Sequence, residues 1–227
     1  MKLRDLEVKF DFKYPILFKQ MEEDGMFNIG AYGAMWYSTV FPLIKDNPTL
    51  LLHSDDYELL PIEQMEEEIA WFRDPDNYME IKEEYVFIPF AQNGAGDKYC
   101  FFVSAQKEDD IPIVFVWHDD NEVIWEAKNI QDFVFKRILQ DMTRVDTYNK
   151  QSEEEFKNNL VVTLKTHSRY LTQDKVALLE RLTQRDIVVY ESYGEVCKGF
   201  ITEKEYEELL KEYVPYELMN TTFPYSD

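Results

Sequence analysis

The sequence has few of the features by which several protein classes are recognised. It contains two cysteines among 227 residues and no stretch of 18 consecutive apolar residues. The lack of such a run excludes a transmembrane helix. The N-terminal MKLRDLEVKFDF carries charges throughout, so no secretory signal is expected. Cys100 and Cys197 lie 97 positions apart in apolar surroundings, which predicts two reduced, buried thiols and a cytoplasmic protein.

Basic residues are also scarce. The chain has 24 Lys and Arg residues against 45 Asp and Glu residues, which gives a net charge of −21 and a pI near 4.5. This balance disfavours direct binding to nucleic acid or to an anionic membrane, because both need a cationic surface. A basic protein partner is electrostatically favoured; acidity that serves only solubility is the alternative. Residues 55–84 alone contain twelve acids and two bases.

The motifs of nucleotide binding are missing. The stretch FIPFAQNGAGDKYCFF, residues 87–102, contains a glycine-bearing insert between two apolar runs. GAGDKY lacks the spacing and the hydroxyl of a Walker loop, and it lacks the third glycine of a dinucleotide fingerprint. A strand-like segment follows it where both motifs need a helix. We interpret the insert as a hairpin turn.

Metal and catalytic signatures are missing as well. The three histidines, His53, His118 and His167, are scattered, and residues 74–85 depart from a calcium loop at its glycine and at its final glutamate. No G-x-S-x-G occurs, and neither cysteine has a nearby base in sequence. We therefore expect no catalytic residue, no cofactor and no metal, and interpret the acids of residues 118–122 as a solvated turn. A hydrolase that uses a carboxylate pair stays open, because 45 acids offer many pairs.

The segments that are present predict an α+β fold. Apolar, β-branched and aromatic runs at residues 84–90, 98–105, 111–117 and 122–127 indicate four strands, joined as two hairpins in an antiparallel meander. A helix capped by Asn129 follows them. The helix that begins near Pro61 places Ile62, Met65, Ile69 and Phe72 on one stripe and turns most of its glutamates to solvent.

The flanking segments are less regular. Residues 15–25 fit a helix with Ile16, Leu17, Gln20 and Met21 on one face, and residues 49–60 fit a short apolar strand, a turn and a return. Residues 143–159 fit a linker or a loosely packed helix. Beyond them we expect a helix from Thr172, a hairpin around Tyr193 and Gly194, and a helix with a capping box of Thr202 and Glu205. The expected domains are residues 1–145 and a small α/β extension, residues 146–227.

Residues 14–139 resemble the SMI1/KNR4 family of the SUKH superfamily. The likeness is carried by an apolar strand, a Gly-Asp turn followed by a Y-x-F pattern, a strand that begins with Pro-Ile, an Asp-rich turn, and a helix; the matching positions are Gly96, Asp97, Tyr99, Phe101, Pro112, Ile113, Ile130, Phe133 and Val134. Asn129 replaces the serine that is usual before the helix, which conserves the capping chemistry.

The resemblance implies a meander sheet of at least four antiparallel strands with helices packed on one side. It also implies a role in binding. Bacterial members are similar to immunity proteins that neutralise polymorphic or contact-dependent toxins, often nucleases or deaminases. Fungal members resemble scaffolds that regulate cell-wall synthesis, which is the alternative function. A carboxylate-based hydrolase is the second alternative.

The expected mechanism is occlusion of the active cleft of a basic toxin by carboxylates set among apolar anchors. The expected contacts are acids in the turn before residue 61, on the helix that follows, and in the second hairpin turn: Asp55, Asp56, Glu58, Glu63, Glu66, Glu67, Asp119 and Asp120. A solvated surface is the competing interpretation for each group. The sequence names neither the toxin nor the oligomeric state.

Overall fold

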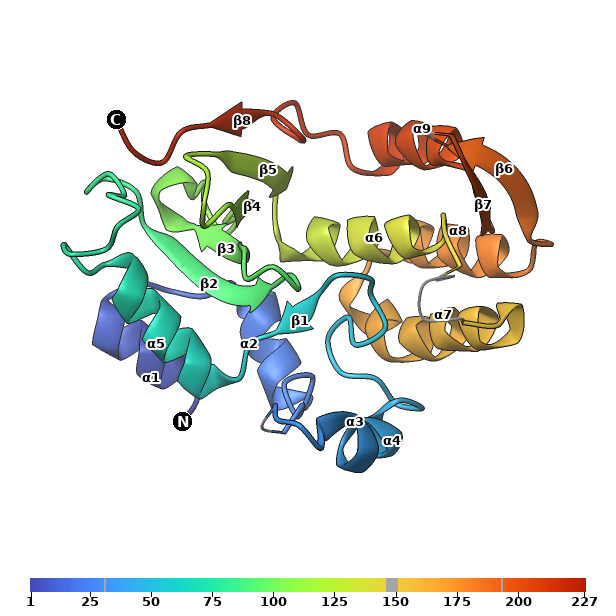
Figure 1. The fold of residues 1–227 in the computed structure, drawn as a ribbon, viewed down its shortest axis with the longest axis horizontal. Coiled ribbons are helices and arrows are strands. Elements are labelled where there is room, and N and C mark those ends of the chain that lie inside the picture. Colours follow the sequence, from blue (N-terminus) through green and yellow to red (C-terminus); the bar gives the residue numbers. More distant parts are fainter. Residues whose placement is uncertain (31, 146–150, 193) are drawn as a thin grey trace. The chain divides into compact units, whose positions relative to one another are not determined.

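The computed structural model describes residues 1–30, 32–145, 151–192 and 194–227, which have an α+β fold (Figure 1). Their helices are α1 (Leu3–Phe10), α2 (Ile16–Glu23), α3 (Trp36–Thr39), α4 (Phe41–Ile44), α5 (Ile62–Phe72), α6 (Ile130–Asp141), α7 (Glu153–His167), α8 (Gln173–Thr183) and α9 (Glu203–Tyr213), with short 3-10 helices at Val103–Ala105 and Ser168–Tyr170. Their strands are β1 (Glu58–Leu59), β2 (Phe87–Gln92), β3 (Lys98–Phe102), β4 (Ile113–Val116), β5 (Val123–Ala127), β6 (Val188–Ser192), β7 (Glu195–Gly199) and β8 (Thr222–Phe223). Within these ranges every helix is too short or too polar to span a bilayer.

The chain is grouped into two compact units, each of which contains residues from both halves of the sequence. Unit 1 consists of Met1–Ala31, Asp56–Phe133 and Tyr216–Asp227, and unit 2 of Tyr32–Asp55 and Val134–Pro215. The boundary therefore falls inside α6. The compact units have other bounds than the domains expected from the sequence. The division expected between residues 145 and 146 stays a prediction.

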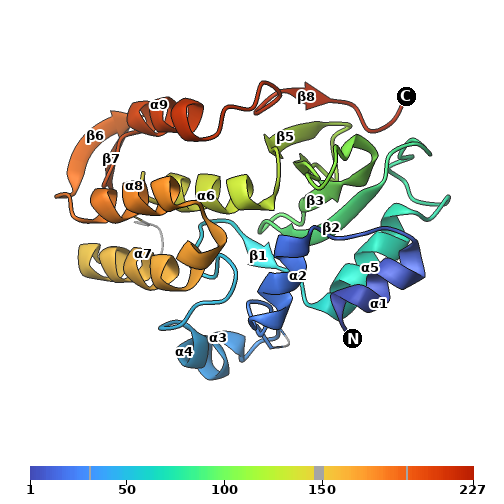
Figure 2. The same cartoon turned by 180° about the vertical axis from the view of Figure 1, so that it is seen from behind.

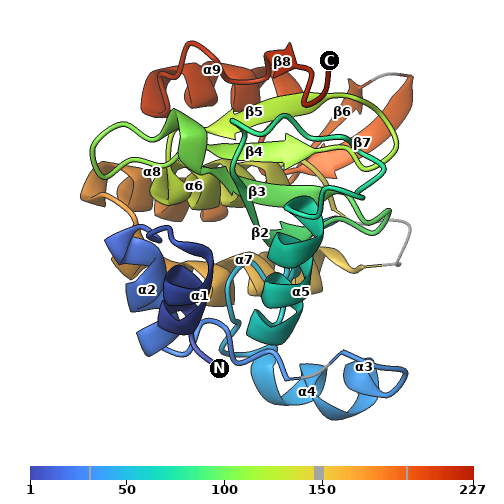
Figure 3. The same ribbon diagram turned by 90° about the vertical axis from the view of Figure 1, so that its left-hand side faces the viewer.

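Unit 1 is built on a six-stranded antiparallel sheet with the order β1-β2-β3-β4-β5-β8 (Figure 1). Figure 3 shows its central strands from the side. The four central strands follow one another in sequence and are joined as hairpins, which confirms the expected meander. The two edge strands have two residues each and pair with β2 and β5. One of them, β8, lies near the C-terminus, so the last segment of the chain completes the sheet.

Helices cover one face of this sheet, as expected for the α+β class. Phe18 of α2 packs edge-on against Phe90 and Phe101, with ring centroids 5.5 and 4.8 Å apart. Phe133 in the first turn of α6 lies 5.3 Å from the ring of Tyr99 on the same face. Because side chains alternate along a strand, these aromatic residues and their neighbours on β2, β3 and β4 form one continuous layer.

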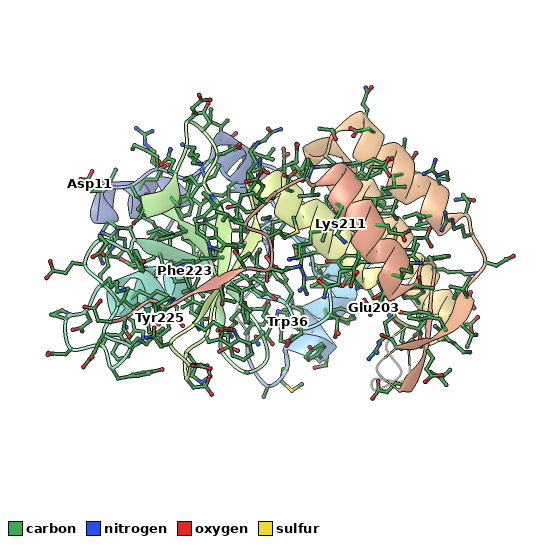
Figure 4. The ribbon with its side chains drawn as sticks, turned by 90° about the horizontal axis from the view of Figure 1, so that it is seen from above. Asp11, Trp36, Glu203, Lys211, Phe223 and Tyr225 are labelled. Atoms are coloured by element: carbon green, nitrogen blue, oxygen red, sulfur yellow. The ribbon has the colours of Figure 1, made fainter. Side chains whose placement is uncertain are left out.

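The opposite face is covered mainly by chain without regular structure. Its core contains residues of the sheet, of the end of α5, of the segment after α5, and of the C-terminal segment: Phe72, Met79, Phe87, Cys100, Phe102, Val114, Val116, Val123 and Tyr225. Figure 4 shows Phe223 and Tyr225 on the C-terminal segment. The ring of Phe223 stacks on Phe102 at 5.4 Å. The segment after α5 is thus held in place by the burial of its apolar side chains, such as Met79, against the sheet.

Local sequence signals account for the turns and caps. Gly96 has a φ of +97°, so the β2–β3 turn uses a glycine where the chain must adopt a left-handed conformation. Asn129 accepts a hydrogen bond from the backbone N–H of Asp132 at 2.9 Å and thereby caps α6. In α5, Met65, Ile69 and Phe72 are buried as the stripe predicts.

One helix was not expected, and two expectations were wrong in part. The N-terminus forms helix α1, which the charge pattern did not reveal. Residues 49–54 form turns in place of a strand, and only Glu58–Leu59 pairs with the sheet. Helix α2 buries Phe18 and Met21, while Ile16 is exposed, because the aromatic layer of the sheet selects the face that carries Phe18.

Most of the C-terminal expectations are confirmed for the part that the structure describes. Helices α8 and α9 and the β6–β7 hairpin lie where they were expected. Thr202 accepts a hydrogen bond from the backbone N–H of Glu205, which is one half of the expected capping box, while the Glu205 carboxylate accepts from Arg185 at 2.6 Å. Of the segment 143–159, the part from Glu153 belongs to α7, whereas residues 146–150 lie outside the described residues, as does Tyr193 in the hairpin turn.

Unit 2 has its own core. Helices α7 and α8 pack against each other (Figure 2), and Phe156 of α7 stacks on Phe200 at 5.4 Å. His167, at the end of α7, is fully buried. Its Nε2 accepts a hydrogen bond from the backbone N–H of Leu51 at 3.0 Å, and its Nδ1 lies 2.9 Å from the carbonyl oxygen of Thr163. This neutral tautomer holds the loop before residue 56 on the helix.

Burial lowers the pKa of His167 from 6.5 to about 4, and the backbone hydrogen bond to Thr163 offsets this only in part. Above pH 6.5 the imidazole is neutral in both the folded and the unfolded chain. As the pH falls, the unfolded chain takes up a proton that the folded chain refuses, so the free energy of unfolding decreases. Asp141 acts in the opposite direction: burial raises its pKa to about 6, so on a fall in pH the folded chain takes up this proton before the unfolded chain does, and the free energy of unfolding increases.

We therefore expect the variant His167→Gln, which keeps a donor and an acceptor but cannot titrate, to show a flatter pH dependence of stability. Between pH 7.5 and pH 5, the free energy of unfolding of the parent protein should fall by about 2 kcal/mol more than that of the variant. Urea denaturation at both pH values measures the difference, and the range stays above the pI near 4.5. Parallel curves for the two proteins would show that His167 is not held neutral by the fold.

Candidate protein-binding surface

The negative charge of the chain is concentrated in unit 1. This unit contains 28 Asp and Glu residues against 10 Lys and Arg residues, a net charge of −18. Unit 2 contains 17 against 14, a net charge of −3. Since acidity that serves only solubility has no reason to favour one unit, this distribution makes the surface of unit 1 the candidate for binding a basic partner.

The three acids expected in the turn before α5 have different environments. Asp55 is exposed in unit 2, and its backbone N–H donates to the carboxylate of Asp141 at 3.2 Å. Asp56 begins unit 1 with a φ of +48°, and its carboxylate accepts a hydrogen bond from the backbone N–H of Gly94 at 2.8 Å. Glu58 is exposed on β1 and accepts from the side chain of Gln92 at 3.1 Å. Asp56 therefore serves partly to position the β2–β3 turn.

The acidic face of α5 is partly neutralised by the N-terminus of the chain. Glu66 forms an ion pair with Lys9 of α1 at 2.6 Å, and Glu63 lies 3.5 Å from the terminal amine of Met1. Glu67 is exposed and forms no ion pair within the described part of the chain. Of the three acids expected here, Glu67 keeps its charge fully available to a partner.

The β4–β5 turn carries Asp119 and Asp120, which are both exposed. Beneath them lies Asp97, whose side chain is only 1 % exposed. One oxygen of Asp97 accepts hydrogen bonds from the backbone N–H of His118 at 3.0 Å and lies 2.6 Å from its Nδ1. The other oxygen accepts from the side-chain amide of Asn93 at 3.0 Å. Asp97 thus joins the β2–β3 turn to the β4–β5 turn.

Asp97, His118 and Asp119 also form a group whose possible ligand atoms lie within 4.8 Å of one another. Such a group has the chemistry to hold a divalent cation. However, the Asp97 carboxylate already receives three hydrogen bonds from protein donors. The geometry is therefore explained by a structural clamp between two turns.

A further surface was missed by the sequence interpretation. Trp71 and Tyr78 flank the segment that follows α5, and both side chains are exposed, by 40 % and 63 %. The segment between them carries Asp74 and Asp76, which are also exposed. A signal was present in the sequence: Trp71 lies off the apolar stripe of α5, so the helical period turns a large aromatic residue outward.

The clamp gives a prediction about stability. Replacement of the buried acid in Asp97→Ala leaves the donors of Asn93 and His118 without an acceptor. We expect the free energy of unfolding to fall by about 3 kcal/mol. The matched variant Asp119→Ala removes an exposed acid of the β4–β5 turn. It should change the free energy of unfolding by about 0.5 kcal/mol or less. Urea denaturation of both variants tests this, and equal effects would contradict the structural role of Asp97.

Residues 34–136 match the model of the SMI1 / KNR4 family (SUKH-1). The matched part includes α5, the four central strands of the sheet and the first half of α6. No curated protein and no solved structure matches the chain significantly. The match agrees with the resemblance of residues 14–139 that the Gly-Asp turn and the following strands carry. Over residues 34–136, this chain carries a domain of the SMI1/KNR4 family (SUKH-1).

Proposed function

We propose that the protein is a non-catalytic, cytoplasmic immunity protein that binds a bacterial toxin domain and neutralises it. The carrying observation is the concentration of negative charge in unit 1, a net −18 within a chain whose other unit has a net −3. The SMI1/KNR4 domain supports a role in protein interaction. The toxin is of the nuclease or deaminase type, because such enzymes need a basic cleft to hold a polyanionic substrate.

Neutralisation follows from occupation of that cleft. Carboxylates of unit 1 take the positions that substrate phosphates would otherwise occupy, so substrate is excluded as long as the complex lasts. The contacts come from acids of the turns and of α5 in unit 1: Asp56, Glu58, Glu63, the half-buried Glu66, Glu67, Asp119 and Asp120. Asp55, also expected as a contact, is exposed and belongs to unit 2. Long-range attraction between the acidic unit and the basic toxin speeds their association.

The test begins with isolation of the partner by affinity capture at low salt and with expression of its toxic domain. One equivalent of the immunity protein should abolish the enzymatic activity of that domain. The association rate constant should fall at least tenfold between about 50 and 500 mM salt, because ions screen the steering field. A partner without toxic activity would favour a regulatory scaffold. Turnover of a substrate by the acidic protein alone, without its partner, would favour a hydrolase.

Matched charge variants locate the interaction. The quadruple variant Glu58→Gln, Glu67→Gln, Asp119→Asn, Asp120→Asn removes four exposed acids of unit 1. It should slow association by about tenfold. The control Glu154→Gln, Glu191→Gln, Glu207→Gln, Glu212→Gln removes four exposed acids of unit 2 and changes net charge equally. Stopped-flow association measures both, and equal slowing by the two variants would contradict a binding surface on unit 1.

A further inference from the structure

Unit 1 exposes an aromatic pair within its acidic surface. The rings of Trp71 and Tyr78 lie 6.0 Å apart at an interplanar angle of 49°. Their exposed fractions of 40 % and 63 % are large for side chains of this size. Exposed aromatic residues that are held rigidly are typical anchors of protein interfaces, because they offer a large contact area with little entropy to lose.

The segment that carries this pair is ordered by its own hydrogen bonds. Asn77 is buried, its side-chain amide donates to the carbonyl oxygen of Trp71 at 2.9 Å, and its side-chain oxygen accepts from the N–H of Met79 at 2.9 Å. The carboxylate of Asp74 accepts from the N–H of Asp76 at 2.9 Å. A surface that is ordered before binding loses less entropy when a partner arrives.

The β4–β5 turn lies beside Tyr78. The phenolic hydroxyl donates to the carbonyl oxygen of His118 at 2.9 Å, next to Asp119 and Asp120. Tyr225 lies close to the same groups: burial raises its pKa, and the neighbouring Tyr78, Asp120 and Asp119 raise it further. The aromatic pair is therefore bordered by carboxylates from two segments that are far apart in the sequence.

These carboxylates are available to a partner. Within the described ranges, no lysine, arginine or histidine forms an ion pair with Asp74, Asp76 or Asp120. The cations of the surrounding chain are engaged elsewhere: Arg73 donates to the carbonyl oxygen of Phe10 at 2.7 Å, and Lys82 pairs with Asp227 at 3.3 Å. The site presents aromatic faces and negative charge together.

One side chain matches this combination better than any other. A guanidinium group is planar, stacks on aromatic rings and donates in a fork to carboxylates. An ammonium group is compact and strongly hydrated, so it gains less from the aromatic face. The chemistry of the site thus selects arginine over lysine, whereas net charge alone would accept both.

We propose that Trp71 and Tyr78, with the carboxylates of Asp119 and Asp120, form an anchor site for an arginine side chain on a loop of the partner protein. This inference rests on the proposed function, whose basic partner it specifies. The exposed apolar residues of unit 2 provide the contrast: Met35, Tyr37 and Leu43 lie within residues 25–44, which contain no charged residue. The carboxylate next to this stretch in sequence, Asp46, is paired with Lys45 at 2.8 Å.

The site is tested with a short, capped Gly/Ser peptide that contains two arginines, added to the full-length ¹⁵N-labelled protein. The indole N–H of Trp71, assigned with the variant Trp71→Phe, and the amides of Tyr78 and Asp119 should shift saturably with a millimolar Kd. The same peptide with lysine should bind about threefold more weakly, and the uncharged citrulline peptide should cause no shift. Equal binding of the arginine and lysine peptides would overturn the proposal.

Variants separate the anchor from general attraction. Tyr78→Ala should weaken binding of the arginine peptide about fivefold. The double variant Asp119→Asn, Asp120→Asn should also weaken binding of this peptide, although it leaves the aromatic pair intact. The matched control is Tyr37→Ala, since Tyr37 is an exposed tyrosine of unit 2, and it should leave the Kd unchanged. Shifts spread evenly over all acidic segments, or equal effects of Tyr78→Ala and Tyr37→Ala, would refute the site.

The outcome is distinguishable from that of the proposed function. If a captured toxin is inhibited and the double variant Trp71→Ala, Tyr78→Ala inhibits it equally well, the arginine anchor is wrong and the immunity function stands. If the peptide binds as described but the captured partner has no toxic activity, the anchor stands and the immunity function is wrong.

Discussion

The buried carboxylate of Asp97 is the interaction on which the exposed turns of unit 1 depend. It receives hydrogen bonds from Asn93 in one turn and from His118 in the other. Tyr78 then donates to the carbonyl oxygen of His118, so the segment after α5 is attached to the same turn. A continuous series of bonds therefore sets the distance between the aromatic pair and the acids Asp119 and Asp120, although all of these side chains stay open to solvent. The buried carboxylate of Asp97 fixes the two turns, while the exposed aromatic rings and carboxylates remain accessible to a partner.

A net charge of −18 in unit 1 is a liability for folding, because like charges repel in the compact state. The structure offsets part of it with ion pairs that join separate segments. Lys9 of α1 pairs with Glu66, and Lys98 of β3 pairs with Glu68 at 2.8 Å. These pairs lie where α5 meets α1 and the sheet. The acids of the segment after α5 and of the β4–β5 turn have no such role in packing, so their field is available to a partner.

The predictable part of this fold is the part that local chemistry determines. Alternating apolar residues, the Asn-Gly turn and the cap at Asn129 predicted the meander and α6, and an apolar stripe predicted α5. Strand β8 has two residues, and its pairing with β5 depends on chain nearly a hundred residues away, so no local pattern reveals it.

The environments of the acids were equally hidden from local patterns. Composition predicted that the surface near α5 is negative, yet it could not show that Lys9 neutralises Glu66 or that Asp56 is bound to a backbone amide. Trp71 could have been found, since its position off the stripe is visible in the sequence.

Charge and shape have different tasks in recognition of a basic partner. A field that extends over a whole unit speeds encounter with any basic protein, but it does not distinguish one such protein from another. Discrimination needs groups at fixed positions, where a wrong side chain leaves a carboxylate or a ring without its complement. The Trp71–Tyr78 pair has that property, because the buried amide of Asn77 and the bond to His118 hold it in one geometry. Substitution of distant acids should therefore act on the association rate, whereas substitution of this pair should act on dissociation, since only the bound state contains its contacts.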